Sequence, residues 1–190
     1  LALGIDNAWH ISDTAFAGSD VLTTSYTLAQ SIIKITKPDI IFCGKQSTDG
    51  DTSQVGPEIA EFLQIPHASY VTEIKEVTDE YIIVNCNMGS YKETVKLSLP
   101  CLISVEKDSF QPRMSSFRDK IEAQKKTIST IELKDLEDKN LDNYGYSGSP
   151  TKVNKIYVPQ IIRQAKIISE SSDFAIDMIM KNLVDWEVLK

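Results

Sequence analysis

The clearest structural pattern in the sequence lies in Asp39-Ile-Ile-Phe-Cys-Gly-Lys-Gln-Ser-Thr-Asp-Gly-Asp-Thr-Ser-Gln-Val-Gly-Pro-Glu-Ile-Ala60. Its opening residues, 39–43, have the continuous apolar character of a strand buried on both faces, as in a parallel sheet. After a polar loop, apolar residues from Val55 to Leu63 recur at helical spacing, and Pro57 is tolerated because the first helical turn needs no amide donors. Strand, loop and helix in this order predict an α/β domain.

The residues before this stretch predict another strand and a connecting helix. Residues 8–12 are a short strand candidate, and the small-residue loop 13–20 ends in a helix cap at Ser19 or Asp20. The helix is expected to run to about Lys37 and to bury the face that carries Leu22, Tyr26, Ala29, Ile32 and Ile33. Strand, helix and strand then form a right-handed crossover unit.

The residues after this stretch change to strand-like alternation. Segments 69–75, 81–85 and 91–97 are separated by turn signals and predict an antiparallel hairpin ladder with one solvated face. Residues 100–105 then return to a buried strand. The expected fold class is therefore α/β, with a mainly parallel sheet and an added antiparallel ladder.

The remaining residues are less regular. Residues 106–152 are rich in turn signals and predict an irregular segment and linker. Residues 153–158 are a strand candidate, and an amphipathic helix behind a cap at Ser172 or Asp173 has Ile176, Ile179, Met180 and Leu183 on one face. The expected division is an α/β domain at 1–105, the irregular segment at 106–152 and an extended arm at 153–190.

Composition limits the classes of protein to which the chain can belong. Its 190 residues are 42% hydrophobic and 25% charged, as in a globular protein. The apolar runs are too short for a membrane span, and a net charge of −7 argues against nucleic-acid binding through phosphate neutralisation. Cys43, Cys86 and Cys101 contain no Cys-x-x-Cys pair and predict buried thiols in a cytoplasmic protein. Since Leu1 is not Met, we expect the start of the domain to lie outside this sequence.

The polar loop after the buried strand has the composition of a nucleotide-binding loop. Amides of the first helical turn and the positive end of the helix dipole attract phosphate oxygens at the carboxyl end of a parallel strand. The hydroxyl groups of Ser47, Thr48, Thr52 and Ser53 add donors, and Gly50 is expected to allow a backbone conformation that a side chain would block. The residues alone therefore indicate phosphate binding.

The same pattern leaves alternatives open. The loop matches neither G-x-x-x-x-G-K-S/T nor G-x-G-x-x-G, and it is equally consistent with a surface loop in which Asp51 or Thr52 only caps the helix. Asp49 and Asp51 are candidates for Mg²⁺, but such acids also suit hydrogen bonds to backbone and ribose, so no metal site is expected. Without a phosphate-loop lysine motif or a catalytic dyad, a nucleotide hydrolase or transferase is disfavoured and no catalytic residue is assigned.

Cys43-Gly-Lys-Gln-Ser-Thr-Asp-Gly-Asp-Thr-Ser-Gln-Val-Gly-Pro-Glu-Ile-Ala60 resembles the signature region of the beta subunit of electron transfer flavoproteins. Gln111-Pro-Arg113, Ala123 and Lys125-Lys-Thr-Ile128 are similar to the recognition loop of that family. Gly148-Ser-Pro-Thr-Lys-Val153 resembles a late segment of the family. Most of the chain can be laid on the family, beginning after its opening segment.

The resemblance implies an electron-transfer subunit that pairs with an alpha subunit carrying one FAD. The beta subunit itself binds AMP in the simple branch or a second FAD in the electron-bifurcating branch. Segments 13–20 and 148–150 look like the bifurcating branch, which favours FAD over AMP. In that branch NADH gives a hydride to the beta-subunit FAD. One electron then goes to an acceptor such as ferredoxin, and the other goes through the alpha-subunit FAD to an acyl-CoA dehydrogenase-like or lactate dehydrogenase-like partner.

The resemblance also assigns roles to individual residues. Phe117 occupies the place of an apolar anchor that inserts into the partner dehydrogenase, with Arg113 and Met114 beside it, although packing of Phe117 on its own domain is the alternative. The terminal helix would pack against the alpha subunit, or else close over the sheet of this chain. The nucleotide would be bound by Gly44, Gln46, Ser47, Thr48, Asp49, Gly50, Asp51, Thr52, Ser53, Gln54 and Val55.

Overall fold

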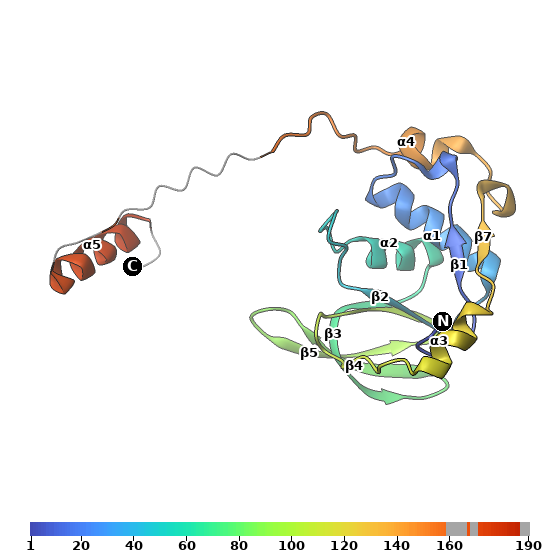
Figure 1. The fold of residues 1–190 in the computed structure, drawn as a ribbon, viewed down its shortest axis with the longest axis horizontal. Helices are drawn as coiled ribbons and strands as arrows, with labels where there is room; N and C mark the ends of the chain where they lie inside the picture. Colours follow the sequence, from blue (N-terminus) through green and yellow to red (C-terminus); the bar gives the residue numbers. More distant parts are fainter. Residues whose placement is uncertain (159–166, 168–170, 187–190) are drawn as a thin grey trace. The chain divides into compact units, whose positions relative to one another are not determined.

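The computed structural model describes residues 1–158, 167 and 171–186, and the chain divides into two compact units, 1–152 and 153–190 (Figure 1). Its elements are β1 (Trp9–Ile11), α1 (Val21–Ile35), β2 (Ile40–Gly44), α2 (Val55–Leu63), β3 (His67–Val77), β4 (Tyr81–Asn87), β5 (Lys92–Ser98), β6 (Cys101–Val105), α3 (Phe117–Gln124), β7 (Ser129–Ile131), α4 (Gly145–Gly148) and α5 (Ser172–Asp185). Short 3₁₀ helices cover Thr14–Phe16, Leu133–Asp135 and Leu141–Asn143. The chain has an α/β fold, which confirms the expected class.

The larger sheet has the strand order β2-β6-β3-β4-β5. Its first three strands are parallel, and β3, β4 and β5 form an antiparallel ladder. Ile40 lies opposite Cys101 and Gly44 opposite Val105, so β2 and β6 end side by side. The polar loop therefore leaves the sheet next to the residues that follow β6.

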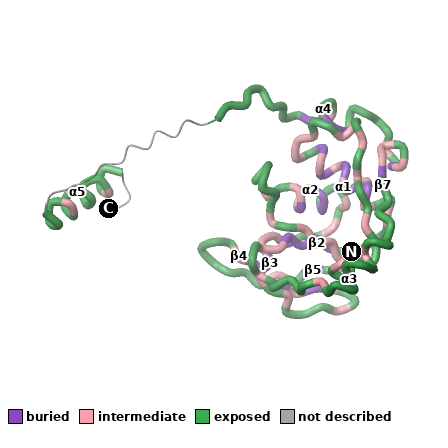
Figure 2. Tube along the Cα trace, in the orientation of Figure 1, coloured by how far each residue is buried: buried purple, intermediate pink, exposed green. Residues whose placement is uncertain are grey.

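The strand buried on both faces is β6. Cys101, Leu102 and Ile103 are all buried, whereas Phe42 of β2 is 57% exposed. Figure 2 shows buried stretches in α1 and in the larger sheet, between intermediate and exposed stretches. The expectation of full burial is therefore wrong for β2, which pairs only with β6 among the described strands, and confirmed for residues 100–105. A strand paired on one side has less neighbouring structure to cover its side chains.

The short strand β1 does not join the larger sheet. It pairs in parallel with β7, with Trp9 opposite Ser129 and Ile11 opposite Ile131. The predicted strand at 8–12 is confirmed, but its placement in one crossover unit with β2 is wrong. The connection through α1 links two sheets because residues 129–131 supply the partner strand for β1.

Helix α1 buries small side chains. Asp20 caps it by accepting a hydrogen bond from the Thr23 amide at 3.1 Å. The buried hydroxyl groups donate to carbonyl oxygens one turn earlier, as Ser25 does to Val21 at 2.7 Å. Leu22 and Ile33 are exposed, so their expected place in the core is wrong. The buried residues are Thr23, Ser25, Thr27, Ala29 and Ser31.

The antiparallel ladder matches its prediction. Ile82, Val84 and Cys86 alternate along β4 and are buried. On the opposite face Asn85 donates to a Glu73 carboxylate oxygen at 2.7 Å and accepts from the Thr94 hydroxyl at 2.8 Å. The antiparallel ladder thus has one buried face and one face exposed to solvent.

Residues 129–149 pack within the first unit, against α1 and the 3₁₀ helix at Thr14–Phe16, more closely than their irregular pattern indicates. Tyr144 is buried against the rings of Phe16 and Tyr26, with ring centroids 5.6 and 5.4 Å away. The Tyr26 hydroxyl donates to Asp138 at 2.7 Å, and burial together with this carboxylate raises the pKa of Tyr26 to about 12. These contacts attach the segment to α1.

The second unit contains one described helix. Residues 153–158 have neither helical nor strand structure, so the predicted strand is wrong; their alternating side chains have no described strand to pair with. Helix α5 is confirmed, with its cap at Ser171, one residue earlier than expected. None of the helices in the described ranges is long and apolar enough to cross a bilayer.

Candidate functional site

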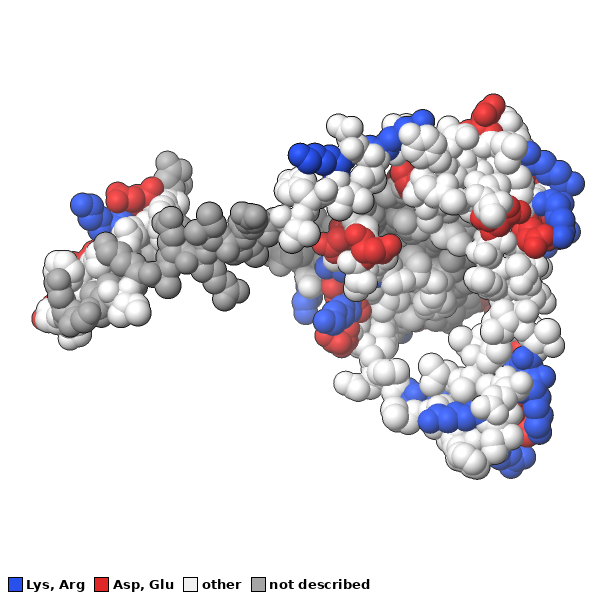
Figure 3. Space-filling view, turned by 45° about the horizontal axis from the view of Figure 1, so that its top comes forward, with Lys and Arg blue, Asp and Glu red and all other residues white. Residues whose placement is uncertain are grey.

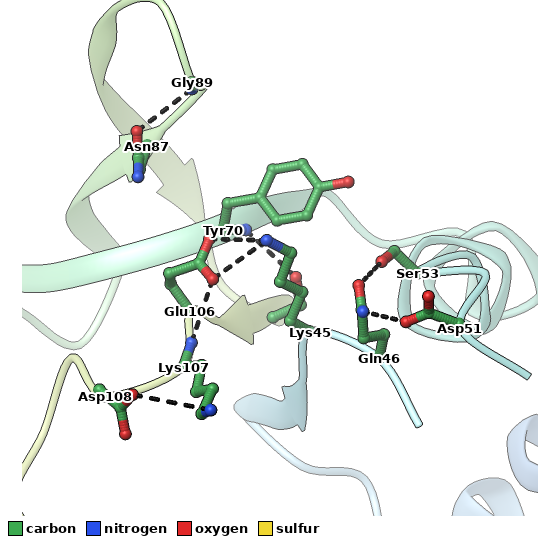
Figure 4. Close-up of polar contacts among 11 residues, drawn as sticks. Lys45, Gln46, Asp51, Ser53, Tyr70, Asn87, Gly89, Glu106, Lys107 and Asp108 are labelled. Carbon is green, nitrogen blue, oxygen red and sulfur yellow. Dashed lines mark hydrogen bonds and ion pairs between the residues drawn. The ribbon is translucent and has the colours of Figure 1, made fainter. Parts of the chain in front are cut away.

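The loop between β2 and α2 is folded around the side chain of Gln46 (Figure 4). Its amide oxygen accepts a hydrogen bond from the Ser53 hydroxyl at 2.7 Å, and its amide nitrogen donates to the Asp51 carboxylate. Asp51 and Ser53 both have left-handed backbones, with φ of 52° and 58°. Gln46 therefore holds together two residues whose backbone conformations would otherwise be unfavourable.

Gly50 does not have the role expected of it. Its φ lies outside the left-handed region, and a Cβ at this position would come no closer than 3.4 Å to the Ser47 hydroxyl oxygen. The expectation that only glycine fits here is wrong, because the residues of this turn with left-handed backbones are Asp51 and Ser53 instead.

Hydrogen bonds from Ser47 and from backbone amides hold the pKa of Asp49 below its usual value, so Asp49 keeps its negative charge.

Helix α2 begins without a side-chain cap. Its N-cap is Gln54, and the side chain of Gln54 makes no capping hydrogen bond. The alternative in which Asp51 or Thr52 caps this helix is therefore wrong. Amides of the first helical turn have no partner within the helix, and Pro57 has no amide hydrogen. The amides of Val55 and Gly56 are thus the donors at this end of α2.

Gly56 lets the start of α2 lie directly on β2. A Cβ at Gly56 would be 2.6 Å from the sulfur of Cys43 and 3.5 Å from Leu102. Burial raises the pKa of Cys43, so its side chain is a neutral thiol that acts as packing material. Gly56 was not among the site residues predicted from the sequence, although a glycine in the first turn of the expected helix was a local signal for close packing.

Two hollows share residues 44–47 in their linings. The first has a volume of about 430 Å³ and the second about 530 Å³. The first is lined by Thr24, Cys43, Gly44, Lys45, Gln46, Ser47, Asp49, Thr52, Ser53, Gln54, Val55 and Gly56. The second is lined by Gly44, Lys45, Gln46, Ser47, Thr48, Asp51, Val105, Glu106 and Lys107. Every predicted nucleotide-binding residue except Gly50 therefore lines at least one hollow.

Lys45 links the loop to the end of β6. Its ammonium nitrogen lies 3.1 and 3.2 Å from the two carboxylate oxygens of Glu106 and 5.0 Å from the centroid of the Tyr70 ring (Figure 4). Sequence analysis missed both Glu106 and Tyr70. Local patterns contain no signal for them, because the ion pair spans 61 residues of chain.

The two segments that resemble the bifurcating branch meet in the structure. The buried hydroxyl oxygen of Ser149 accepts from the Asp20 amide at 2.9 Å, and Asp20 accepts from the Thr151 amide at 3.0 Å. Although burial raises the pKa of Asp20, the hydrogen bonds from Thr151 and Thr23 outweigh it and lower the pKa overall. Segments 13–20 and 148–150 thus form one hydrogen-bonded corner.

The segment around α3 exposes apolar side chains. Phe117 is 79% exposed and Met114 is 89% exposed, so Phe117 does not pack on its own unit. Ser116 and Asp119 cap α3 reciprocally, at 3.1 and 3.0 Å. This Ser-x-x-Asp capping box is a local sequence signal for the start of α3, which was not predicted from the sequence.

The side chain of Arg113 is hydrogen-bonded within the chain, whereas those of Phe117 and Met114 are exposed. Its Nε donates to the carbonyl oxygen of Leu3 at 2.9 Å, and Lys126 donates to that of Ile5 at 3.0 Å. The structure therefore uses Arg113 within the chain, to fix residues 3–5 beside α3. Its proposed contact with a partner remains a prediction.

Charged side chains of both signs are interspersed over the face drawn in Figure 3.

Within the described residues, no group of three or more His, Cys, Asp or Glu side chains is placed to hold a metal ion. Asp49 and Asp51 are engaged by Ser47 and Gln46 respectively. The chemistry of the loop is thus that of hydroxyl and amide donors.

Comparison with known proteins agrees with this arrangement. The sequence model of the electron transfer flavoprotein domain matches residues 1–136. The beta subunit of the electron transfer flavoprotein of Megasphaera elsdenii is 36% identical over 198 residues, which cover all of this chain and 73% of that protein. The chain belongs to the electron transfer flavoprotein beta-subunit family. The resemblance drawn from residues 43–60 is thereby confirmed.

Other members of the family are similar to the same extent. The electron transfer flavoprotein beta subunit of Thermoanaerobacterium thermosaccharolyticum is 37% identical over 191 residues, covering all of this chain and 72% of that protein. A subunit of the caffeyl-CoA reductase-Etf complex of Acetobacterium woodii is 37% identical over 159 residues, covering 84% of this chain and 60% of that protein. Electron transfer flavoproteins bind flavin or nucleotide, and their beta subunits pair with an alpha subunit and with dehydrogenases.

Proposed function

We propose that this chain is a flavin-binding beta subunit of an electron-bifurcating electron transfer flavoprotein. The observation that supports nucleotide binding is the start of α2, which has no side-chain cap and lies beside a hollow of about 430 Å³ lined with hydroxyl groups. Amides of Val55 and Gly56 supply donors to phosphate oxygens, and Thr52 and Ser53 add hydroxyls. These residues bind and orient a nucleotide without providing a nucleophile or an acid.

The preference for FAD over AMP rests on the resemblance of segments 13–20 and 148–150 to the bifurcating branch. A bound flavin would take a hydride from NADH and pass its two electrons on singly, one to ferredoxin and one through the alpha-subunit FAD to a dehydrogenase. Relatives named as subunits of caffeyl-CoA and acryloyl-CoA reductase systems favour an acyl-CoA dehydrogenase-like partner. A lactate dehydrogenase-like partner is the alternative, and the cytoplasm is the proposed location.

The second candidate function is a beta subunit of the simple branch that holds AMP as a structural ligand. The hollow beside α2 supports AMP binding as much as FAD binding, because the same phosphate donors serve both nucleotides. The subunit would then have no redox centre of its own.

The experiment that separates these functions is the nucleotide stoichiometry of the native complex. The complex is denatured, and released FAD and AMP are quantified per alpha-beta pair. We expect two FAD and no AMP. One FAD with one AMP would support the simple branch, and one FAD with no AMP would contradict nucleotide binding by the loop.

We also propose that Phe117 anchors the partner dehydrogenase. The Phe117→Ala variant is expected to slow electron transfer to the dehydrogenase about tenfold, because burial of an exposed aromatic ring contributes roughly 1.5–3 kcal/mol. Reduction of the flavin by NADH should remain unchanged. Stopped-flow measurement of both steps checks this prediction.

The control for this variant is Tyr91→Ala, which removes another exposed ring, in the turn just before β5. Its electron transfer to the dehydrogenase should stay within twofold of the unmodified complex. Equal slowing in the two variants would contradict a specific anchor at Phe117.

A further inference from the structure

Helix α3 has no place in a hydrophobic core. None of its eight residues is buried, and Phe117 at its start is 79% exposed. A helix of this length is marginally stable by itself in water. Among the described residues, the hydrogen bonds that join residues 110–128 to the rest of the chain come from the side chains of Arg113 and Lys126. The position of α3 therefore depends on these two side chains and on the return of the chain into β7.

Both side chains bind the same short segment, residues 3–5, which we call the N-terminal platform. The Nε of Arg113 donates to the carbonyl oxygen of Leu3 at 2.9 Å, and the Nζ of Lys126 donates to that of Ile5 at 3.0 Å. Figure 1 shows the N-terminus beside α3, as these contacts require. Because Arg113 precedes α3 and Lys126 follows it, the platform holds the chain on both sides of the helix.

Gly4 lets the side chain of Arg113 lie directly on the platform. Its φ is 96°, in the left-handed region, and its amide donates to the carbonyl oxygen of Leu1 at 3.0 Å to close a turn. A Cβ at Gly4 would be 2.5 Å from the Nη2 of Arg113. A side chain at this position would therefore push the guanidinium group away from the platform.

We infer that the N-terminal platform positions the partner-binding segment, and that Arg113 and Lys126 are positioning residues that act through α3. This inference rests on the proposed role of Phe117 as the anchor for the partner dehydrogenase. An anchor that is already held in place loses less conformational freedom when it binds. The two contacts therefore strengthen association with the dehydrogenase and leave the rate of electron transfer within the bound complex unchanged.

The test separates affinity for the dehydrogenase from the rate in the bound complex. The native complex is reduced and mixed, in a stopped-flow instrument, with rising concentrations of the acyl-CoA dehydrogenase of the same cells. Arg113→Gln and Lys126→Met should each raise the half-saturating concentration about fivefold, as expected for the loss of one hydrogen bond. The limiting rate should change less than about twofold, because the bound state is unaltered. Arg113→Lys, which keeps a charged donor, should recover most of the affinity.

The matched controls are Arg118→Gln and Lys125→Met. Each removes one positive charge from the same segment, but in the described structure neither side chain binds the platform, and Lys125 donates instead to Glu122 at 2.8 Å. Both should leave the half-saturating concentration unchanged. Equal weakening in the controls would show that the charge of the segment governs binding rather than its attachment, and it would overturn the inference.

A variant of the platform itself breaks the Arg113 contact without changing α3. Gly4→Ala should weaken binding of the dehydrogenase about as much as Arg113→Gln does. The double variant should bind no more weakly than either single variant, because both substitutions remove the same contact. Losses that multiply in the double variant would show that Gly4 and Arg113 act separately, which contradicts the platform.

Hydrogen exchange gives a readout that needs no partner. In Arg113→Gln and in Lys126→Met, the amides of residues 117–124 should exchange about threefold faster than in the unmodified complex, because the helix is less firmly attached. Unchanged exchange in both variants would show that the platform does not hold α3, and it would overturn the inference whatever the kinetics. If circular dichroism shows that one variant misfolds, the other decides the question.

The outcomes distinguish the platform from the proposed anchor. If Phe117→Ala weakens binding while the platform variants speed exchange without weakening it, the anchor stands and the positioning role is overturned. If Phe117→Ala leaves binding unchanged, the proposed anchor fails, and the positioning role fails with it. Weaker binding in all three variants, with a constant limiting rate and faster exchange in the platform variants, supports the inference.

Discussion

Gly56→Ala is expected to release the nucleotide from the complex. The new Cβ would lie 2.6 Å from the sulfur of Cys43, so the start of α2 must move away from β2. The amides of Val55 and Gly56 would then lose their alignment with phosphate oxygens. Hydrogen bonds to charged groups contribute about 1.5–3 kcal/mol each, so we expect affinity to fall about a hundredfold. Titration of AMP and FAD into the nucleotide-free complex measures this effect.

A second substitution tests the cause of that loss. Cys43→Ala removes the sulfur that meets the new Cβ, so the double variant Cys43→Ala with Gly56→Ala should regain most of the affinity. Gly50→Ala is the matched control in the same loop, because a Cβ there meets only the Ser47 oxygen at 3.4 Å. Strong loss of nucleotide in Gly50→Ala, or no recovery in the double variant, would contradict the close approach of α2 as the cause.

Gly145→Ala is expected to destabilise the first unit by about 3 kcal/mol. Gly145 has a φ of 53°, and a Cβ there would lie 2.2 Å from the carbonyl oxygen of Ala15 and 2.9 Å from that of Ala17. Both contacts are with backbone, which cannot rotate away. The corner formed by segments 13–20 and 148–150 should therefore separate. Urea unfolding followed by circular dichroism measures the loss.

The control for Gly145→Ala is Gly89→Ala. Gly89 also has a left-handed backbone, with φ of 84°, but a Cβ there would meet nothing within 4 Å. Gly89→Ala should therefore lower the free energy of unfolding by about 1–2 kcal/mol, which is the cost of a left-handed backbone for a residue with a Cβ. The difference between the two variants is then the cost of the overlap with Ala15. Equal losses would show that the late segment can move without resistance.

Sequence patterns predicted the elements whose formation depends on near neighbours. The helix after Gln54, the antiparallel ladder at 67–98 and the buried strand at 101–105 all follow from periodicity and turn residues. The loop between β2 and α2 was predicted as the nucleotide site for the same reason, and this remains our proposal. Its residues 44–55 are contiguous, so their grouping needs no knowledge of the tertiary structure.

Predictions failed where a residue depends on a distant partner. The exposure of Phe42 follows from β2 having one neighbouring strand in the described part of the chain. The separation of β1 from β2 follows from the pairing of β1 with residues 129–131. The strand expected at 153–158 has the right alternation but no described strand to pair with. Apolar alternation shows that a strand is compatible with a segment, whereas pairing decides whether it forms.

The order of residues along the chain was enough to predict the family, the α/β class and the contiguous loop that binds a nucleotide in our proposal. The folded chain was needed to see that α2 begins uncapped, that Gly56 rather than Gly50 is the sterically required glycine, and that Glu106 and Tyr70 contact Lys45. Helical and strand periodicities act over a few residues and are readable along the chain. Close approach and ion pairing depend on how elements separated by tens of residues pack, and no local pattern records that packing.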